Sequence, residues 1–266
     1  MFRWGVAQEL VSPITADALK YVPALRLGKT TAPESKPRED VPNDVVDATL
    51  PYLLPTVAAM VQVQQWATMR PSEVCRMRVG DIDMSRKDGI WLYHLPLHKT
   101  EATIKQKKIV PLGKPEQALI RPYLEGKSPE RAVFSPKTTM LERYARDAKN
   151  RTTKIPPNKL RRSHKAVPKR TASEHYCSKS YARSIRRAIE QANRSLSDAQ
   201  QIPHWFPYQL RHAGVTELVA ENDGNLGVAR AVAGHKSLAI TLGYNHADLK
   251  IAIEQAKKRR QRRNNA

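Results

Sequence analysis

Apolar residues recur at helical spacing along most of the chain, and this pattern predicts the larger part of the fold. The longest amphipathic stretch places its apolar side chains three or four residues apart, at Tyr181, Ile185, Ala188, Ala192 and Leu196. Such spacing gives one apolar face to an α-helix. The same pattern, over shorter stretches, predicts helices at residues 115–124, 207–221, 226–233, 238–243 and 249–256.

The first half of the chain predicts two further helices and a hairpin. Residues 45–66 place Leu54, Val57 and Val61 on one face, and residues 71–78 begin with a proline, which is favoured at a first helical position. Two apolar segments have the composition of strands, with a polar turn at 98–103 between them: residues 90–95 and 104–110. Val133-Phe134 predicts a short buried strand. The fold class is therefore mainly α with a small antiparallel β-sheet (α+β).

Proline and polar residues divide the chain. Residues 29–43 contain three prolines and no apolar period, which is typical of a linker. Before it, one or two short helices are predicted, with a helix end at Leu25–Gly28 where the glycine would be the cap. The predicted organisation is a short N-terminal segment, a linker, one large domain and a basic tail: residues 1–28, 29–43, 44–257 and 258–266.

The charge balance points to a polyanionic partner. The 266 residues include 46 Lys and Arg against 25 Asp and Glu, a net charge of +21. Such an excess destabilises a compact chain by self-repulsion and is most often explained by nucleic acid, although a basic ribosome-associated protein would share it. Cys75 and Cys177 make no disulfide framework, no apolar run would span a bilayer, and no signal peptide is recognisable. A cytoplasmic location without membrane contact is therefore expected.

Several short motifs carry groups suited to phosphate chemistry. In chain order they are Ala67-Thr68-Met69-Arg70-Pro71-Ser72-Glu73, Tyr208-Gln209-Leu210-Arg211-His212, Ala233-Gly234-His235 and Tyr244. Two arginines suit a phosphodiester because each guanidinium offers a planar fork of donors and keeps its proton. Together and in this order the motifs resemble the catalytic domain of the tyrosine recombinases, the phage-integrase type. The resemblance covers roughly residues 40–255.

The resemblance implies a role for each matched residue. Arg70 and Arg211 would bind the non-bridging phosphate oxygens, and Tyr244 would attack the phosphorus to form a 3′-phosphotyrosyl link. His235 would donate a hydrogen bond to a phosphate oxygen. A lysine in the hairpin turn would protonate the departing 5′ oxygen, and Lys99 has that place. Lys105, Lys107 and Lys108 are competitors that fall on or beside the second strand.

Other matched residues would support the site, and one departs from the family pattern. Glu73 would orient Arg70 or cap its helix, and His212 would be a supporting residue. Tyr208 occupies the position where the family usually has histidine. A neutral tyrosine can hydrogen-bond a phosphate but is a poor base near pH 7, so this residue bears on how Tyr244 loses its proton.

Basic residues away from these motifs are candidates for DNA contacts. They crowd one proline-containing segment, at Lys159, Arg161, Arg162, Lys165, Lys169 and Arg170. A solvated loop explains this segment equally well. No metal site is predicted, because His94 and His98 lie on a strand and a turn, where they would not converge as they would on a helix. No cofactor is predicted.

The family's catalytic domain usually follows a helical DNA-binding domain, and residues 1–28 resemble only its end. We therefore expect an N-terminally truncated site-specific recombinase or integrase that binds double-stranded DNA and self-associates on it through residues 247–257. Those residues could equally pack on their own domain. The alternative is a catalytically impaired DNA-binding remnant. A type IB topoisomerase fits the hairpin lysine and Gly-His turn less well, and an RNA-binding protein would leave the ordered motifs unexplained.

Overall fold

The computed structural model describes residues 2–26, 28–31, 33, 39–95, 108–154, 172–222, 224–234 and 237–242. The chain divides into two compact units, Met1–Arg38 and Glu39–Ala266. The division falls inside the predicted linker at 29–43, while the functional assignment of the segments stays a prediction. None of the helices in the described ranges has the length and apolar character needed to cross a bilayer.

The N-terminal unit contains short helices, as predicted: α1 (Phe2–Ala7), α2 (Pro13–Ala18) and the 3-10 turn η1 (Leu19–Tyr21). The predicted helix end at Leu25–Gly28 is wrong, because helical structure stops at Tyr21. Pro23 accounts for this, since a proline lacks the backbone N–H and also disfavours helical geometry in the residue before it. Gly28 has a φ of 70°, but no helix precedes it directly.

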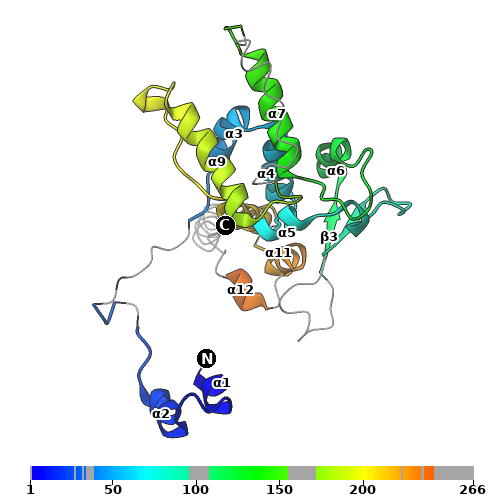
Figure 1. The fold of residues 1–266 in the computed structure, drawn as a ribbon. Helices are drawn as coiled ribbons and strands as arrows, with labels where there is room; N and C mark the ends of the chain where they lie inside the picture. The colour runs from blue at the N-terminus through cyan, green and yellow to red at the C-terminus, as the bar shows by residue number, and fades with distance from the viewer. Residues whose placement is uncertain are drawn as a thin grey trace, which may run out of the picture. The chain divides into compact units, whose positions relative to one another are not determined.

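The larger unit is built from helices around α4 (Pro55–Trp66), which contacts α5, α6, α7, α9 and α10 (Figure 1). α4 is buried on several sides, which suits a segment that is apolar nearly all round. The other helical segments of this unit are α3 (Asn43–Thr49), η2 (Leu50–Tyr52), α5 (Pro71–Arg76), η3 (Val79–Asp81), α6 (Lys114–Ile120), η4 (Arg121–Tyr123), α7 (Pro136–Lys149), α9 (Ser178–Asn193), η5 (Asp198–Gln200), α10 (Pro207–Glu221), α11 (Leu226–Ala233) and α12 (Leu238–Leu242).

The helix predicted at 45–66 is interrupted. It forms α3, the turn η2 and α4, with Leu53 and Leu54 extended between them. Pro51 and Pro55 cause the break, because each lies at the start of a new helical segment where no intrahelical N–H is needed. The break places α3 beside η2 and frees α4 to run through the core.

The sheet has three antiparallel strands in the order β1 (Ile82–Asp83), β2 (Trp91–His94) and β3 (Ile109–Leu112). Trp91 pairs with Leu112 and His94 with Ile109, so the described hairpin strands are in register. The strand predicted at 104–110 corresponds to β3, which continues beyond the predicted end to Leu112. Residues 96–107, with the predicted turn, lie outside the described part of the chain. The predicted strand at Val133-Phe134 is wrong: Val133 donates a backbone hydrogen bond to Met77, but no strand forms there. The mainly α fold with a small antiparallel sheet is confirmed.

α10 approaches the end of α4 very closely at Gly214. A Cβ atom added to Gly214 would lie 2.7 Å from the backbone oxygen of Gln65 and 3.0 Å from the Thr68 side chain. Only a residue without a side chain fits this contact. The close approach brings the middle of α10 against the turn that connects α4 to α5.

α7 was not predicted, and a contact between distant residues explains its position. Glu142 on α7 accepts hydrogen bonds from the backbone N–H of Thr56, at 3.1 Å to each carboxylate oxygen, and from its hydroxyl at 2.6 Å. These donors lie in the first turn of α4, where backbone N–H groups have no intrahelical partner. Glu142 therefore caps α4 from a different helix and fixes α7 against it.

Candidate active site

The turn between α4 and α5 carries the first arginine motif. Thr68 in this turn is buried and has a φ of 47°, in the left-handed region that β-branched residues rarely adopt. The chain then passes to Arg70, which is the N-cap of α5, with Pro71 at the first helical position. The strained geometry directs the Thr68 carbonyl toward α10.

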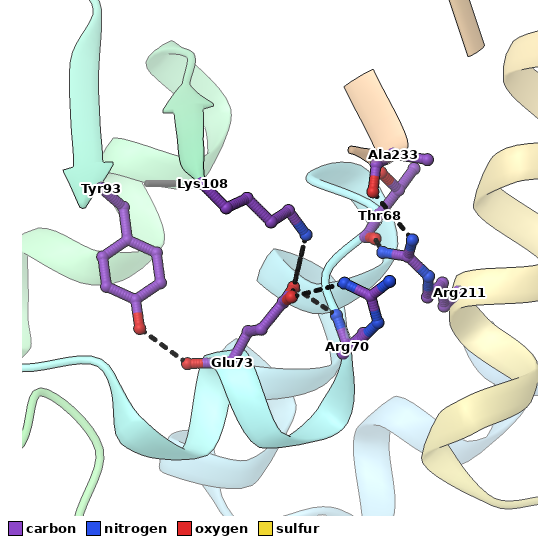
Figure 2. A network of polar contacts seen from close by, with 7 residues as sticks. All are labelled: Thr68, Arg70, Glu73, Tyr93, Lys108, Arg211 and Ala233. Atoms are coloured by element: carbon purple, nitrogen blue, oxygen red, sulfur yellow. Dashed lines mark hydrogen bonds and ion pairs between the residues drawn. The ribbon is translucent and has the colours of Figure 1, made fainter. Parts of the chain in front are cut away.

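Arg211 on α10 is buried, with 1% of its surface exposed. Its Nη1 donates to the Thr68 carbonyl at 2.6 Å, and its Nη2 donates to the Ala233 carbonyl at 2.8 Å (Figure 2). The two carbonyls belong to the α4–α5 turn and to the last residue of α11. The guanidinium fork therefore joins three segments that are far apart in the sequence and is held in one orientation by them.

Glu73 ties the side chain of Arg70 to the start of α5. One carboxylate oxygen accepts from the Arg70 backbone N–H at 2.8 Å, and the other accepts from Arg70 Nη1 at 2.9 Å. Glu73 thus caps the start of α5 and pairs with the Arg70 guanidinium, while a part for it in a reaction stays a prediction. The Arg70 side chain is 39% exposed, so it remains accessible to a ligand while its orientation is restricted.

Lys108, just before β3, completes the network from the other side. Its Nζ lies 2.9 Å from both carboxylate oxygens of Glu73, and its side chain is 11% exposed. Figure 2 shows the lysine reaching across from the sheet to the carboxylate that also faces Arg70. The hydroxyl of the buried Tyr93 on β2 donates to the Glu73 backbone carbonyl at 3.0 Å and so fastens α5 to the same sheet.

Burial and neighbouring charge shift two pKa values in this network. Burial and two nearby arginine cations lower the pKa of Lys108 to about 8, although its ion pair with Glu73 acts in the opposite direction. Burial alone would raise the pKa of Glu73, but its ion pair with Lys108 and its bonds to Arg70 outweigh burial and lower it. Glu73 is therefore a carboxylate at neutral pH.

The C-terminal end of α11 closes over Lys108. Gly234 has a φ of 63° and caps this helix in the left-handed conformation. A Cβ atom on Gly234 would lie 2.7 Å from Cε of Lys108. Glycine therefore meets two requirements at this position: it adopts the left-handed conformation of the helix cap, and it leaves space for the methylene chain of Lys108.

The structure brings Arg70, Glu73 and Arg211 into one cluster through Thr68 and Lys108. Arg70 and Lys108 pair with the Glu73 carboxylate, and Arg211, which binds two backbone carbonyls, lies near Lys108. Three cations against one carboxylate favour an anionic ligand such as a phosphodiester. Tyr208 and His212 lie one turn apart on α10, with ring centroids 5.0 Å apart. The remaining predicted site residues lie outside the described ranges: Lys99, His235, Tyr244, Lys159, Arg161, Arg162, Lys165, Lys169 and Arg170.

Sequence reasoning treated Lys108 as a lesser competitor of Lys99, yet Lys108 is part of the cluster. The alternation of buried and exposed residues along β3 could have identified Lys108 as an inward-facing residue. Val110 and Leu112 are the buried residues of β3, and Lys108 shares their parity along the chain. A lysine on the inward face of a strand is unusual unless it has a partner.

A second basic feature lies between α7 and α9, which extend from the helical body in the same direction in Figure 1. A cavity of 340 Å³ there has an apolar floor and no acidic residue among those that line it. Four arginines line it, two from each helix: Arg143, Arg146, Arg183 and Arg187. The sequence analysis did not single them out, although their spacing of three or four residues places each pair on one helix face.

Comparison with known proteins establishes the class. A sequence profile described as the Phage integrase family matches residues 51–250, which include every described member of the cluster. The chain belongs to this family. The predicted recognition of a tyrosine recombinase catalytic domain of the phage-integrase type is thereby confirmed.

Individual relatives agree with this placement. The tyrosine recombinase XerC of Thermodesulfovibrio yellowstonii (strain ATCC 51303 / DSM 11347 / YP87) is 25% identical over 196 residues, which are 74% of this chain and 52% of that protein. The chain thus spans about half the length of this curated relative.

Solved structures share the fold. The Tn1549 transposon integrase in complex with circular intermediate DNA matches with a TM-score of 0.59 at 13% identity, over 92% of this chain and 75% of that one. A lambda integrase dimer bound to a COC′ core site matches with a TM-score of 0.52 at 14% identity, over 91% of this chain and 55% of that one. At such identities the likeness describes the fold alone.

Proposed function

We propose that the protein is a site-specific DNA recombinase that cuts and rejoins strands through a phosphotyrosyl intermediate. The observation that supports the proposal is the cluster of Arg70, Arg211 and Lys108, three cations with the single carboxylate of Glu73 among them as the partner of Arg70 and Lys108, in a chain of the phage integrase family. Two guanidiniums fixed at one place suit the charge that develops on the non-bridging oxygens of a phosphodiester. Fixed donors also need no rearrangement as the reaction proceeds.

In the proposed reaction the Tyr244 phenol oxygen attacks phosphorus and the bond from phosphorus to the 5′ oxygen breaks. The phenol passes its proton to solvent water, and the leaving 5′ oxygen takes one from Lys99. Arg70 and Arg211 hold the phosphate, while His235 donates to one of its oxygens. The phosphotyrosyl link keeps the bond energy of the original diester, so the reverse attack by a 5′ hydroxyl reseals a strand.

Covalent trapping tests this function. Candidate att-like sites are first selected by measuring salt-sensitive binding of the protein to duplexes that contain them. The protein is then incubated with nicked duplexes that carry these sites and denatured with SDS. We expect a protein–DNA band of retarded mobility with the wild type and none with Tyr244→Phe, because phenylalanine has no nucleophilic oxygen. A band that persists in Tyr244→Phe would overturn the assignment of the nucleophile.

A second candidate function is a DNA-binding remnant with impaired chemistry, and Tyr208 is the observation that favours it. Tyr208 precedes Arg211 by three residues on α10 and occupies the family's usual histidine position. The phenol of a tyrosine has a pKa near 10, so it is a poor proton acceptor at neutral pH. Proton removal from Tyr244 would then be slow.

The Tyr208→His variant is expected to form the covalent complex at least about tenfold faster than the wild type near pH 7, because an imidazole can accept the phenol proton. Single-turnover trapping measures the rate, and Tyr208→Phe separates the imidazole from mere loss of the hydroxyl. A slow wild type that histidine accelerates would identify an impaired enzyme. Equal rates in both variants would show that position 208 does not limit the reaction.

We further propose double-stranded DNA as the partner and residues 44–257 as the catalytic domain. The basic residues of segment 159–170 are proposed DNA contacts, and the arginines that line the cavity between α7 and α9 add positive charge on the described surface. Self-association on DNA, with residues 247–257 packing on a neighbouring copy, completes the proposal.

A further inference from the structure

We propose that Lys108 is a positioning residue: it holds the Glu73 carboxylate away from full pairing with Arg70, so that Arg70 keeps its charge for the phosphate. The inference rests on the proposed function and assigns a role beyond it. It makes phosphate binding depend on the charge state of a residue that need not touch the DNA.

The contacts around Glu73 carry the argument. Its two oxygens receive Lys108 Nζ at 2.9 Å each, the Arg70 backbone N–H at 2.8 Å and Arg70 Nη1 at 2.9 Å. A carboxylate offers about four lone-pair sites, and these contacts occupy them. The Arg70 guanidinium consequently shares the carboxylate with a second cation and makes one hydrogen bond to it from Nη1.

Removing the lysine would change this division. With one cation left, the buried carboxylate would draw the Arg70 guanidinium into a two-pronged pair, the geometry that arginine and carboxylate prefer. That pair would neutralise Arg70 and turn its fork away from a ligand. The lysine therefore keeps the cluster net positive and leaves part of the Arg70 fork for the phosphate.

The site around Lys108 makes its charge sensitive to pH. Among the described residues, the charged and titratable groups that face it are Glu73 and Arg70 on α5 and Arg211 on α10, while Gly234 from the end of α11 covers its stem. Tyr93 on β2 stays neutral, because burial, the largest cause, and nearby carboxylates raise its pKa. Burial lowers the pKa of Lys108 to about 8, so the lysine is charged below that pH and neutral above it. The cluster then weakens as the pH rises.

A rival role for Lys108 is proton donation to the leaving oxygen in place of Lys99. DNA in which the bridging 5′ oxygen is replaced by sulfur separates the two roles, because a thiolate leaves without a proton. A proton donor becomes dispensable on the sulfur substrate. A positioning residue stays necessary, because Arg70 must still bind the phosphate.

The test measures single-turnover covalent complex formation from about pH 6.5 to 9.5 with wild type, Lys108→Met and Lys108→Arg. We expect Lys108→Met to be slower by about 10- to 100-fold on oxygen and sulfur substrates alike. The wild-type rate should fall above pH 8, relative to Lys108→Arg, whose guanidinium keeps its charge across this range. Recovery of Lys108→Met on the sulfur substrate, or the same alkaline profile in wild type and Lys108→Arg, would overturn the inference.

A second readout keeps the inference testable if no covalent complex forms at all. Affinity for duplex DNA, measured over the same pH range, should weaken above pH 8 in the wild type and much less in Lys108→Arg. That result without cleavage would reject the proposed function and retain the role of Lys108. Superimposable binding curves would reject the role of Lys108. Glu73→Gln combined with Lys108→Met also removes the carboxylate charge that would draw Arg70 into a two-pronged pair, and serves as the folding control.

Discussion

The Arg211→Lys variant is expected to form the covalent complex about 10³-fold more slowly than the wild type, a loss typical of removing a fixed donor from a phosphoryl-transfer site. Arg211 uses both ends of its fork on backbone carbonyls, at 2.6 Å and 2.8 Å. The single ammonium of a lysine cannot reach both carbonyls and a phosphate with the same geometry. The single-turnover trapping assay measures the rate.

The same substitution is expected to lower the free energy of unfolding by about 1–3 kcal/mol, because a buried carbonyl loses its donor. Urea denaturation measures this loss. The same curve, recorded at the temperature of the trapping assay, shows whether the variant is folded while its rate is measured. Arg76→Lys is the matched control, because Arg76 is exposed at the end of α5. A tenfold change in rate corresponds to about 1.4 kcal/mol of activation free energy. If the rate of Arg211→Lys lay within tenfold of the rate of Arg76→Lys, a direct role of Arg211 in the transition state would be contradicted.

The Gly214→Ala variant is expected to lose about 3 kcal/mol of unfolding free energy, near the upper end for an overpacked core contact. The new methyl group would meet the Gln65 backbone oxygen at 2.7 Å, and the backbone of a packed helix has little freedom to move. The displacement would push α10 from α4 and carry Arg211 away from the Thr68 carbonyl. A shift near 1 Å lowers the rate of a positioned reaction by about 10²-fold.

Thermal and urea unfolding measure the stability of Gly214→Ala, and trapping measures its rate. Gly227→Ala is the comparison, because its added methyl group would approach a side-chain atom, Asn225 Oδ1 at 3.1 Å, rather than backbone at 2.7 Å. The two variants should differ clearly in both measurements. If Gly214→Ala kept wild-type stability, the closeness of the two helices would not be required for the fold.

Where local chemistry determined structure, the sequence predicted it well. The predicted limits of α10 and α11 agree with the structure, because each has a strong local start: Pro207 begins α10, and Asn225 caps α11 through its side chain. Gly234 in the left-handed conformation ends α11. These signals are short-range and can be read from neighbouring residues.

Where distant contacts determined structure, the sequence was less informative. α7 exposes Leu141 and Tyr144, so its apolar pattern is weak, and its anchor is the contact from Glu142 to α4. The site likewise has some features that local sequence predicts and others that depend on distant contacts. Arg70 and Arg211 could be proposed from their motifs, whereas the carbonyl partners of Arg211 and the ion pair of Lys108 depend on tertiary packing.

The two carbonyls that hold Arg211 also determine when the site can exist during synthesis. Arg211 binds a carbonyl 143 positions earlier and another 22 positions later, so the chain must extend to Ala233 before the guanidinium is fixed. A nascent chain released or stalled earlier would leave the arginine unanchored and the phosphate site unformed. The proposed capacity to cut DNA would therefore arise only once nearly the whole of the described chain has folded.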